Sequence, residues 1–412
     1  MLSLKDYLIQ ECRIFEGGAS GHMAHPFDYT EFTLDDIVEL IENLFSGNIE
    51  DITEKVDGTN IQATVNKAGE VVFIRNKGDL NSEKGGMSIS DMASKWADKP
   101  SVAKTFITAG ETITKVFQDI PNKFFNPDDN TRVIVNCECV IAGKTNIIPY
   151  ADAQVDFHNL WIYKYDGSQW IKDEVTKSGL DTIEKACENV DSAQVTPQLI
   201  IKITSESEKL KTKFIKEITH IFKDEKLGPQ DTIEMWKKNG FHNLCESGIS
   251  WILTSDEGFD ILFDRWFNGV KAINIRKIKQ LYPDYSNELD NADKGEYKGW
   301  VESVMEPLDT FFLNLGNSII SLCDGIINQG HESDIITTLR NDLDDITKEI
   351  ERSGSDQIKD KLTKQLVRLE RLGNNINPTE GIVFKYKDKL MKLTGSFAPL
   401  NQILGSIKFS VA

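Results

Sequence analysis

The spacing of apolar residues changes twice along this chain, and this change constrains its fold more than any other feature. From Asp51 to Gly167, apolar and polar residues alternate in NIQATV, EVVFIRN, TRVIVNCECVIAG and NLWIYKYDG, which predicts strands. From roughly Asp173 to Arg371, apolar residues recur at three- and four-residue steps, which predicts helices. Strand character returns at GIVFKYKDKLMKLTG, near the end of the chain. A β-rich domain with a large helical insertion explains this order, because the last strands can complete the first sheet.

We therefore expect an α+β protein with a core of antiparallel sheets and a large helical insertion. Residues 1–172 would hold an N-terminal segment and the main part of the sheet domain, residues 173–372 the helical insertion, and residues 373–412 the completing strands. Two helices are expected outside the insertion. One runs from Leu34 to Phe45 with Thr33 as its N-cap, and the other lies between Ser88 and Phe117.

The composition is that of a soluble globular protein, with 40% hydrophobic and 27% charged residues. Lys and Arg total 47 against 65 Asp and Glu, so the formal charge is −18. Such an acidic chain will not coat nucleic acid non-specifically, and any nucleic-acid role needs a local basic groove, metal ions or a recognised end. The sequence contains no run of about 18 apolar residues and no secretory leader pattern at its N-terminus. We expect no membrane association and a cytoplasmic location, which is the host cytoplasm if the protein is viral.

Six cysteines are spread along the chain, and only Cys137 and Cys139 lie close together. A C-x-C pair within a strand places both thiols on one face. No second cysteine pair is present to complete a zinc site, so buried, reduced thiols are expected.

One short segment, Thr53-Glu54-Lys55-Val56-Asp57-Gly58-Thr59-Asn60, carries most of the functional information. A lysine beside an aspartate and a glycine is common by itself, and its value comes from the segments that follow it in order. These are Arg75-Asn76 at the end of a strand, Glu138 within a strand and followed by Gly143, the alternating Trp161, Tyr163 and Tyr165, Glu380 at the start of a strand, and Lys392 in KLMKLTG.

In this order, the six segments resemble motifs I, Ia, III, IIIa, IV and V of the covalent nucleotidyltransferases, the superfamily of ATP-dependent DNA ligases, RNA ligases and mRNA capping enzymes. The resemblance covers residues 50–167 and 378–396. DNA ligases and capping enzymes usually have an arginine where this chain has Asn60. The form E-K-x-[DH]-G-[ST]-N is similar to the RNA-ligase branch found in bacteriophages and RNA-editing systems. The resemblance implies a ligase (ATP-grasp-like) core and an ATP-dependent RNA ligase that joins 5′-phosphate and 3′-hydroxyl ends through a lysyl-AMP intermediate.

The resemblance also implies roles for individual residues. Lys55 would be the nucleophile, which needs desolvation, nearby cations or a metal-bound phosphate to favour its neutral amine. Arg75 and Lys392 would stabilise charge on phosphates. Glu138 and Glu380 would hold Mg²⁺, with Mn²⁺ as an alternative. The remaining nucleotide contacts would come from Glu54, Asp57, Gly58 and Asn60, with Tyr165, or as second choice Tyr163, stacking on the base or serving only as core aromatics.

Two features depart from the family pattern. Motif V normally carries K-x-K, but here the second position is Thr394, so that either Lys389 supplies the contact from the neighbouring turn or the contact is absent. Only 20 residues follow Lys392, which leaves no room for the OB domain of DNA ligases or the helical C-terminal domain of some RNA ligases. The helical block would then serve as the substrate clamp.

Other interpretations stay open at this point. The protein could transfer nucleotide to another acceptor, or it could be a catalytically silent nucleotide-binding module with the helical block as a partner surface. Retention of the lysine, both glutamates and the arginine disfavours a silent site. The basic stretch from Ile273 to Gln280 is either a solvated helix face or a phosphate-binding stripe. His22 and His25 either pack within their loop or bind pyrophosphate or metal.

Overall fold

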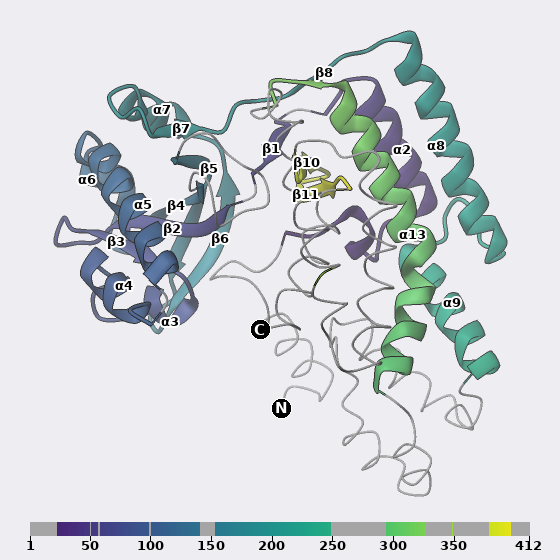
Figure 1. The fold of residues 1–412 in the computed structure, drawn as a ribbon, viewed down its shortest axis with the longest axis horizontal. Helices are drawn as coiled ribbons and strands as arrows, with labels where there is room; N and C mark the ends of the chain where they lie inside the picture. The colour runs from purple at the N-terminus through teal and green to yellow at the C-terminus, as the bar shows by residue number, and fades with distance from the viewer. Residues whose placement is uncertain are drawn as a thin grey trace, which may run out of the picture.

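A computed structural model gives the fold of this chain, which is α+β with antiparallel sheets, as the periodicity predicts (Figure 1). The structure describes residues 23–49, 51–56, 58–98, 100–140, 153–248, 294–326, 348 and 379–396. Two hydrophobic cores organise these residues, one around the larger sheet and one around a smaller sheet and the helices beside it.

The larger sheet contains most of the predicted strands. Its order is β3-β2-β4-β5-β6, all antiparallel, and β7 pairs in parallel with β5. The strand bounds are β2 Thr59–Val65, β3 Val71–Ile74, β4 Thr131–Val140, β5 Gln154–Tyr165, β6 Trp170–Thr176 and β7 Ala193–Val195.

One face of this sheet is apolar and is covered by helices. Ile61 and Ala63 of β2 and Val135 of β4 share a buried core with α5 (Pro100–Gln118) and α7 (Leu180–Cys187). Cys137 and Cys139 lie on this same face, and burial raises the pKa of both thiols well above its usual value. The prediction of buried, unpaired thiols on one strand face is therefore confirmed for this pair.

The shorter helices α4 (Ile89–Lys95) and α6 (Asn122–Phe125) border the same layer, and α4 and α5 together occupy the predicted 88–117 helical stretch.

The opposite face of the larger sheet changes character along its strands. At one end it carries polar side chains, including Asn60, Asn136 and Glu138, which the register places next to one another. At the other end Ile134, Trp161 and Tyr163 form a small apolar cluster, which is covered by α3 (Lys77–Leu80) through Leu80. The polar end is the half of the sheet that bears the candidate site.

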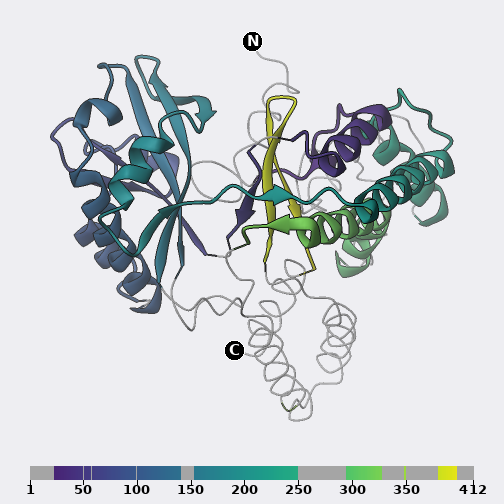
Figure 2. The ribbon, with the colours of Figure 1, turned by 90° about the horizontal axis from the view of Figure 1, so that it is seen from above.

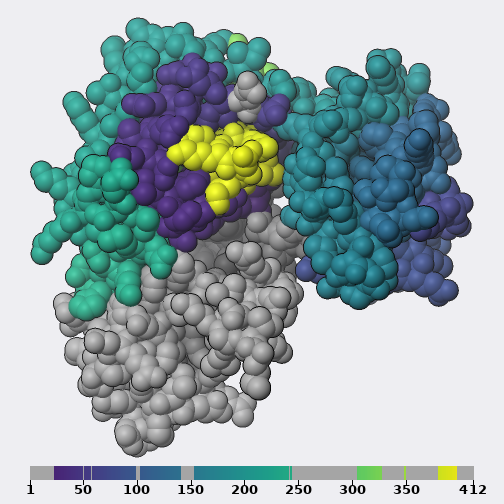
Figure 3. Space-filling model, turned by 180° about the vertical axis from the view of Figure 1, so that it is seen from behind, coloured from purple at the N-terminus to yellow at the C-terminus, as the bar shows by residue number. Residues whose placement is uncertain are grey.

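The last strands pair with β1, which corrects the expectation that they complete the first sheet. β1 (Thr53–Lys55), β10 (Gly381–Tyr386) and β11 (Lys389–Thr394) form a separate antiparallel sheet. Ile382, Phe384 and Tyr386 on one face of β10 are buried against helices, which explains why the hairpin packs there. Figure 2 shows the yellow hairpin between the larger sheet and the helices, and Figure 3 shows its surface beside the N-terminal residues.

Four helices share a core rich in aromatic residues with this smaller sheet. They are α2 (Leu34–Phe45), α8 (Ser205–Asp224), α9 (Ile233–Gly248) and α13 (Lys294–Leu322). The ring of Phe214 in α8 lies 5.9 Å from Phe45 and 5.7 Å from Phe311, measured between ring centroids. Trp236 of α9 is buried here as well. The predicted N-cap of α2 is also confirmed, because the Thr33 side chain accepts a 3.1 Å hydrogen bond from the backbone N–H of Asp36.

The packing divides the chain differently from the expected domain limits. The expected boundary between residues 172 and 173 falls inside β6, and α7 and β7 continue the first core as far as Val195. The described helices beyond it share one core with α2 and the β10–β11 hairpin. Periodicity marks where helices occur, but it does not show which layer a helix covers. The helices predicted at 259–281 and 355–373, the basic stretch 273–280, and Trp251 and Trp266 lie outside the described residues.

A short two-stranded sheet, β8 (Ile200–Ile201) with β9 (Cys323–Asp324), joins the segment before α8 to the end of α13. Among the helices that the structure describes, none combines the length and apolar character needed to cross a membrane.

Candidate functional site

Lys55 lies at the end of β1 and forms an ion pair with Glu380, the residue that precedes β10. Its Nζ is 2.5 Å from Glu380 Oε2, and the two side chains are 24% and 16% exposed. The β-sheet register explains the contact, because Lys55 is directly opposite Gly381. Gly381 has no space for a side chain, since a Cβ there would lie 2.3 Å from the Leu393 carbonyl oxygen. The sheet therefore fixes this ion pair between the two ends of the chain.

Lys392 lies on the same face of this sheet as Lys55. Val383 is opposite both Thr53 on β1 and Lys392 on β11, and cross-strand partners share a face. The alternate residues Ile382 and Leu393 are buried on the helical side. Two of the predicted phosphate-binding cations thus lie on one face.

His25 is next to these two lysines. Ala24 bridges to Met391, and the backbone N–H of Lys392 donates a 3.0 Å hydrogen bond to the Ala24 carbonyl. Burial, followed by the charges of Lys392 and Lys55, lowers the pKa of His25 to about 3. Its ring stacks on Phe27 at 5.0 Å between centroids, so it packs within its loop as favoured from the sequence and also borders the site. His22 lies outside the described residues.

The second part of the site is on the larger sheet, where Asn60 links Arg75 to Glu138. The Asn60 amide nitrogen donates hydrogen bonds to Asn136 Oδ1 at 2.9 Å, the Cys137 carbonyl at 3.2 Å and Glu138 Oε2 at 3.4 Å. A guanidinium nitrogen of Arg75 donates to the backbone carbonyl of Asn60. Burial lowers the pKa of Arg75, and the nearby Glu138 carboxylate opposes that shift. Three predicted site residues therefore form one connected group.

Gly58 brings the backbone between β1 and β2 against β4. A Cβ at this position would lie 2.7 Å from the Cys139 carbonyl oxygen and 2.8 Å from Glu138 Cγ. Only glycine fits without displacing the strand that carries Glu138. Asp57 lies outside the described residues.

Asp156 is a further carboxylate at this site that the sequence reasoning missed. It is opposite Glu138 on the neighbouring strand, so Asn60, Glu138 and Asp156 form one row across β2, β4 and β5. Asp156 accepts hydrogen bonds from Gln194 Nε2 at 2.7 Å and Gln154 Nε2 at 3.0 Å. Burial raises its pKa to about 6. The available signal was a charged residue inside a strand whose neighbours, Val155 and Phe157, are apolar.

His158 was also missed, because its position depends on an irregularity in the sheet. The pairing of β4 with β5 shifts between Asn136 and Cys137, and His158 is the additional residue on β5. Its Nδ1 lies 2.8 Å from Thr196 Oγ1. Burial, then the charges of Lys55 and Lys177, lower the pKa of His158 to about 4. The charge of Lys55 thus reaches a ring on the larger sheet.

Several predicted site residues are not brought to this place. Tyr165 is nine residues further along β5 than Asp156, roughly 30 Å at about 3.3 Å per residue. Tyr163 lies toward the same far end and is buried in the small apolar cluster. The Glu54 side chain is only 1% exposed on the helical face of β1, opposite to Lys55. Lys389, the substitute considered for Thr394, forms an ion pair with Glu31 at the other end of β11.

Glu138 and Glu380 are the carboxylates that could hold a divalent metal. The described residues contain no group of three or more His, Cys, Asp and Glu side chains arranged to hold a metal ion. Mg²⁺ is commonly bound by one or two carboxylates together with phosphate oxygens of the substrate, so the hard oxygens of either glutamate suit this ion.

No protein-family model matches this chain, and no curated protein matches it either.

Proposed function

We propose that this protein is an ATP-dependent polynucleotide ligase of the RNA-ligase type, acting through a lysyl-AMP intermediate. The observation that carries the proposal is the Lys55–Glu380 ion pair, on the sheet face that also bears Lys392. The group formed by Arg75, Asn60 and Glu138 on the larger sheet supports it. A nucleoside triphosphate needs this combination of a nucleophilic amine, cations for the phosphates and carboxylates for a metal.

In the first step, the neutral Lys55 amine attacks the α-phosphorus of ATP. A nitrogen–phosphorus bond forms, the bond from the α-phosphorus to the bridging oxygen breaks, and pyrophosphate leaves. A lysine is protonated at neutral pH, so the ammonium must first lose a proton. Glu380, with an oxygen 2.5 Å away, holds the ammonium in the resting enzyme and is close enough to accept that proton.

The other residues of the site act on charge and position. Bound Mg²⁺, held by Glu380 and Glu138, would neutralise phosphate charge and favour attack on phosphorus. Lys392 faces the same side as Lys55 and stabilises negative charge that develops on the α-phosphate. Arg75 binds the Asn60 carbonyl and therefore positions the strand that carries Asn60.

In the second step, an oxygen of a 5′-phosphate attacks the AMP phosphorus and Lys55 leaves as an amine, which takes up a proton. A 3′-hydroxyl then attacks the activated 5′-phosphate, loses its proton, and displaces AMP to form the phosphodiester. Asn60, at the position where DNA ligases and capping enzymes carry arginine, favours RNA ends as the substrate.

The proposal is tested by incubating purified protein with α-labelled ATP or GTP and Mg²⁺, followed by a denaturing gel. We expect a labelled band with ATP that is absent in Lys55→Ala and retained in Lys164→Ala. Lys164 is a suitable control because it is also ion-paired, at 2.8 Å from Asp173, but lies at the far end of β5. Intact mass measured beforehand identifies enzyme that is already adenylylated and would not take up label.

Other outcomes point to other functions. Label with GTP alone would favour a capping-type reaction, and absence of label from unmodified protein would favour a silent nucleotide-binding module. Label with ATP but no sealing of nicked or single-stranded RNA with 5′-phosphate ends would favour transfer to another acceptor.

A further inference from the structure

Aromatic and basic side chains gather on the larger sheet at the end remote from Lys55. Arg132, Tyr163 and Lys172 are cross-strand partners in one row over β4, β5 and β6. On this side of the sheet α3 contributes Lys77 and covers the apolar cluster. We name this surface the aromatic–basic face, and it comprises Lys77, Arg132, Trp161, Tyr163, Tyr165, Trp170 and Lys172.

Cations and rings alternate across this face. Lys172 Nζ lies 4.3 Å from the centroid of the Trp161 ring, and the Arg132 guanidinium lies 4.5 Å from that of Trp170. The Trp170 and Tyr165 rings are 5.4 Å apart. Tyr165 is 41% exposed, which is unusual for a large aromatic ring. The face therefore offers an open ring beside buried ones that hold the cations in place.

Two lysines of this face have no ion-pair partner among the residues that the structure describes. Neither Lys77 nor Lys172 forms an ion pair with any residue in the described part of the chain. Burial, and then the charge of Lys77, lower the pKa of Lys172. Lys164, which alternates with Tyr163 and Tyr165 along β5, is instead paired with Asp173.

Arg132 is a buried cation whose hydrogen-bonding capacity is only partly used. Its side chain is buried, with the residue 6% exposed, and its Nε has no hydrogen-bond partner among the described residues. The hydrogen bond from its Nη1 to the Gly85 carbonyl oxygen is long, at 3.4 Å. Burying the Arg132 guanidinium, with no ion-pair partner among the described residues, costs free energy that a nearby anion would offset, while Lys77 and Lys172 are exposed and open to an anion.

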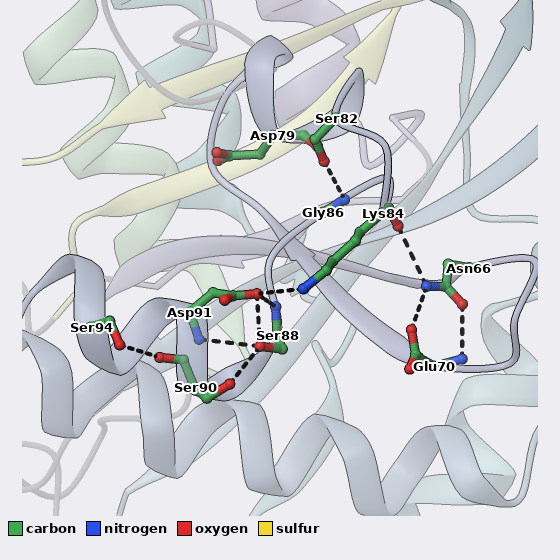
Figure 4. Close-up of polar contacts among 10 residues, drawn as sticks. All are labelled: Asn66, Glu70, Asp79, Ser82, Lys84, Gly86, Ser88, Ser90, Asp91 and Ser94. Atoms are coloured by element: carbon green, nitrogen blue, oxygen red, sulfur yellow. Dashed lines mark hydrogen bonds and ion pairs between the residues drawn. The ribbon is translucent and has the colours of Figure 1, made fainter.

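Residues 82–86 lie against Arg132 through Gly85, and hydrogen bonds within this segment and to Asn66 hold it in place (Figure 4). The backbone N–H of Gly86 donates to Ser82 Oγ at 3.2 Å, and the Lys84 carbonyl accepts from Asn66 Nδ2 at 3.4 Å. Gly85 has φ +69°, and a Cβ there would lie 2.4 Å from Arg132 Nη1. These contacts fix the backbone that lies against Arg132, and the left-handed conformation at Gly85 favours glycine there.

We propose that the aromatic–basic face binds a single-stranded stretch of nucleic acid, with phosphates at Lys77 and Lys172 and a base stacked on Tyr165. Unpaired cations interleaved with rings are the chemistry that single strands require, and in an acidic chain such binding must be local. The roughly 30 Å between Tyr165 and Asp156 is enough for several nucleotides at about 3.4 Å each. That this strand is the one whose end is sealed rests on the proposed ligase function.

The test is fluorescence anisotropy of a labelled, 5′-phosphorylated single-stranded RNA oligonucleotide with the full chain, over a series of salt concentrations. The double variant Lys77→Ala/Lys172→Ala should weaken binding at low salt and lower the slope of log K against log salt by about 1.4, for two phosphate contacts at about 0.7 each. Tyr165→Ala should weaken binding roughly 5- to 100-fold, and Tyr165→Phe should restore it. Lys202→Ala, in which an exposed lysine paired with Asp324 is lost, is the matched control and should leave binding unchanged.

The outcomes separate this inference from the proposed function. RNA binding that survives both Lys77→Ala/Lys172→Ala and Tyr165→Ala would overturn the inference. A second outcome would also overturn the inference, in favour of a surface that binds polyanions in general. In that outcome Lys77→Ala/Lys172→Ala weakens binding of RNA and of an acidic peptide equally, and Tyr165→Ala has no effect. Covalent ATP labelling of Lys55 should persist in the lysine variant. If labelling is absent from the wild type but RNA still binds through these residues, the ligase proposal fails and the binding face stands.

Discussion

Lys55 Nζ and Glu380 Oε2 lie 2.5 Å apart although they come from segments near opposite ends of the chain. The contact exists because β1 pairs with β10 and sets Lys55 opposite Gly381. The ion pair forms only after the hairpin of β10 and β11 has paired with β1. Folding of the smaller sheet and assembly of the site are therefore the same event.

Replacing Glu380 should remove both the partner of Lys55 and a proposed metal ligand. We expect Glu380→Gln, which keeps the shape of the side chain, to slow covalent labelling by roughly 100-fold or more, because charged groups at phosphoryl centres contribute several kcal/mol. The measurement is the labelling rate over a Mg²⁺ titration. Glu31→Gln is the control, since Glu31 pairs with Lys389 on the same sheet but away from Lys55. An unchanged Mg²⁺ dependence would remove Glu380 from the metal site.

Gly58 should tolerate no side chain. Gly58→Ala would place a Cβ 2.7 Å from the Cys139 carbonyl, so the backbone between β1 and β2 or strand β4 must shift. We expect the free energy of unfolding to fall by about 1–3 kcal/mol, and labelling to fall with it, because Glu138 lies at the contact. Gly228→Ala is the control, since its nearest neighbour would be at an ordinary 3.7 Å. Equal urea midpoints for Gly58→Ala and Gly228→Ala would show that a Cβ at position 58 does not clash with the Cys139 carbonyl oxygen.

Strand and helix positions followed from the sequence because burial on one side imposes a period. The alternation in residues 59–65 and 131–140, and the helical spacing in residues 34–45, each reflect one apolar face. Periodicity does not encode which partner a strand chooses, and the hairpin of residues 381–394 was therefore assigned to the wrong sheet. That choice depends on packing of Phe384 and its neighbours against helices distant in sequence.

The site was predicted in part for a similar reason. The family resemblance grouped Lys55, Glu380 and Lys392 as site residues, and the pairing of β1 with β10 and of β10 with β11 brings these three positions to one sheet. Tyr165 was misplaced because an aromatic residue on the correct face can still be far along a long strand. His158 was missed because a bulge, which no residue pattern reveals, changes the direction of its side chain.

The N-cap of α2 should contribute measurably to stability. In the capping box, Thr33 accepts from the Asp36 backbone N–H at 3.1 Å, and the Asp36 carboxylate accepts from the Thr33 backbone N–H at 2.8 Å. We expect Thr33→Ala to lower the free energy of unfolding by about 1 kcal/mol, measured by urea denaturation, and Thr33→Ser to restore most of it. If Thr33→Ser were as unstable as Thr33→Ala, the loss would come from packing of the Thr33 methyl group and not from the cap.

Asp156 should give the stability a distinctive pH dependence. Its pKa is about 6 in the folded protein against 3.8 for an unperturbed aspartate, so between these values the folded state binds more protons than the unfolded state. The free energy of unfolding therefore falls as pH rises from about 4 to about 6. A shift of this size corresponds to a change on the order of 3 kcal/mol. We expect Asp156→Asn to remove this dependence, so that the variant gains stability relative to wild type as pH rises.

Thermal unfolding at pH 4 and pH 8 provides the measurement. The amide introduced by Asp156→Asn keeps one oxygen that can accept from Gln154 or Gln194, as the protonated carboxyl of the wild type does at pH 4, so the variant and the wild type are most alike at that pH. Asp129→Asn is the matched control, because the Asp129 carboxylate is 96% exposed and its removal should shift both curves little. Parallel pH profiles for wild type and Asp156→Asn would contradict the raised pKa. Asp156 would then be ionised in the folded protein at acidic pH, beside Glu138, and the row across β2, β4 and β5 would carry two negative charges throughout.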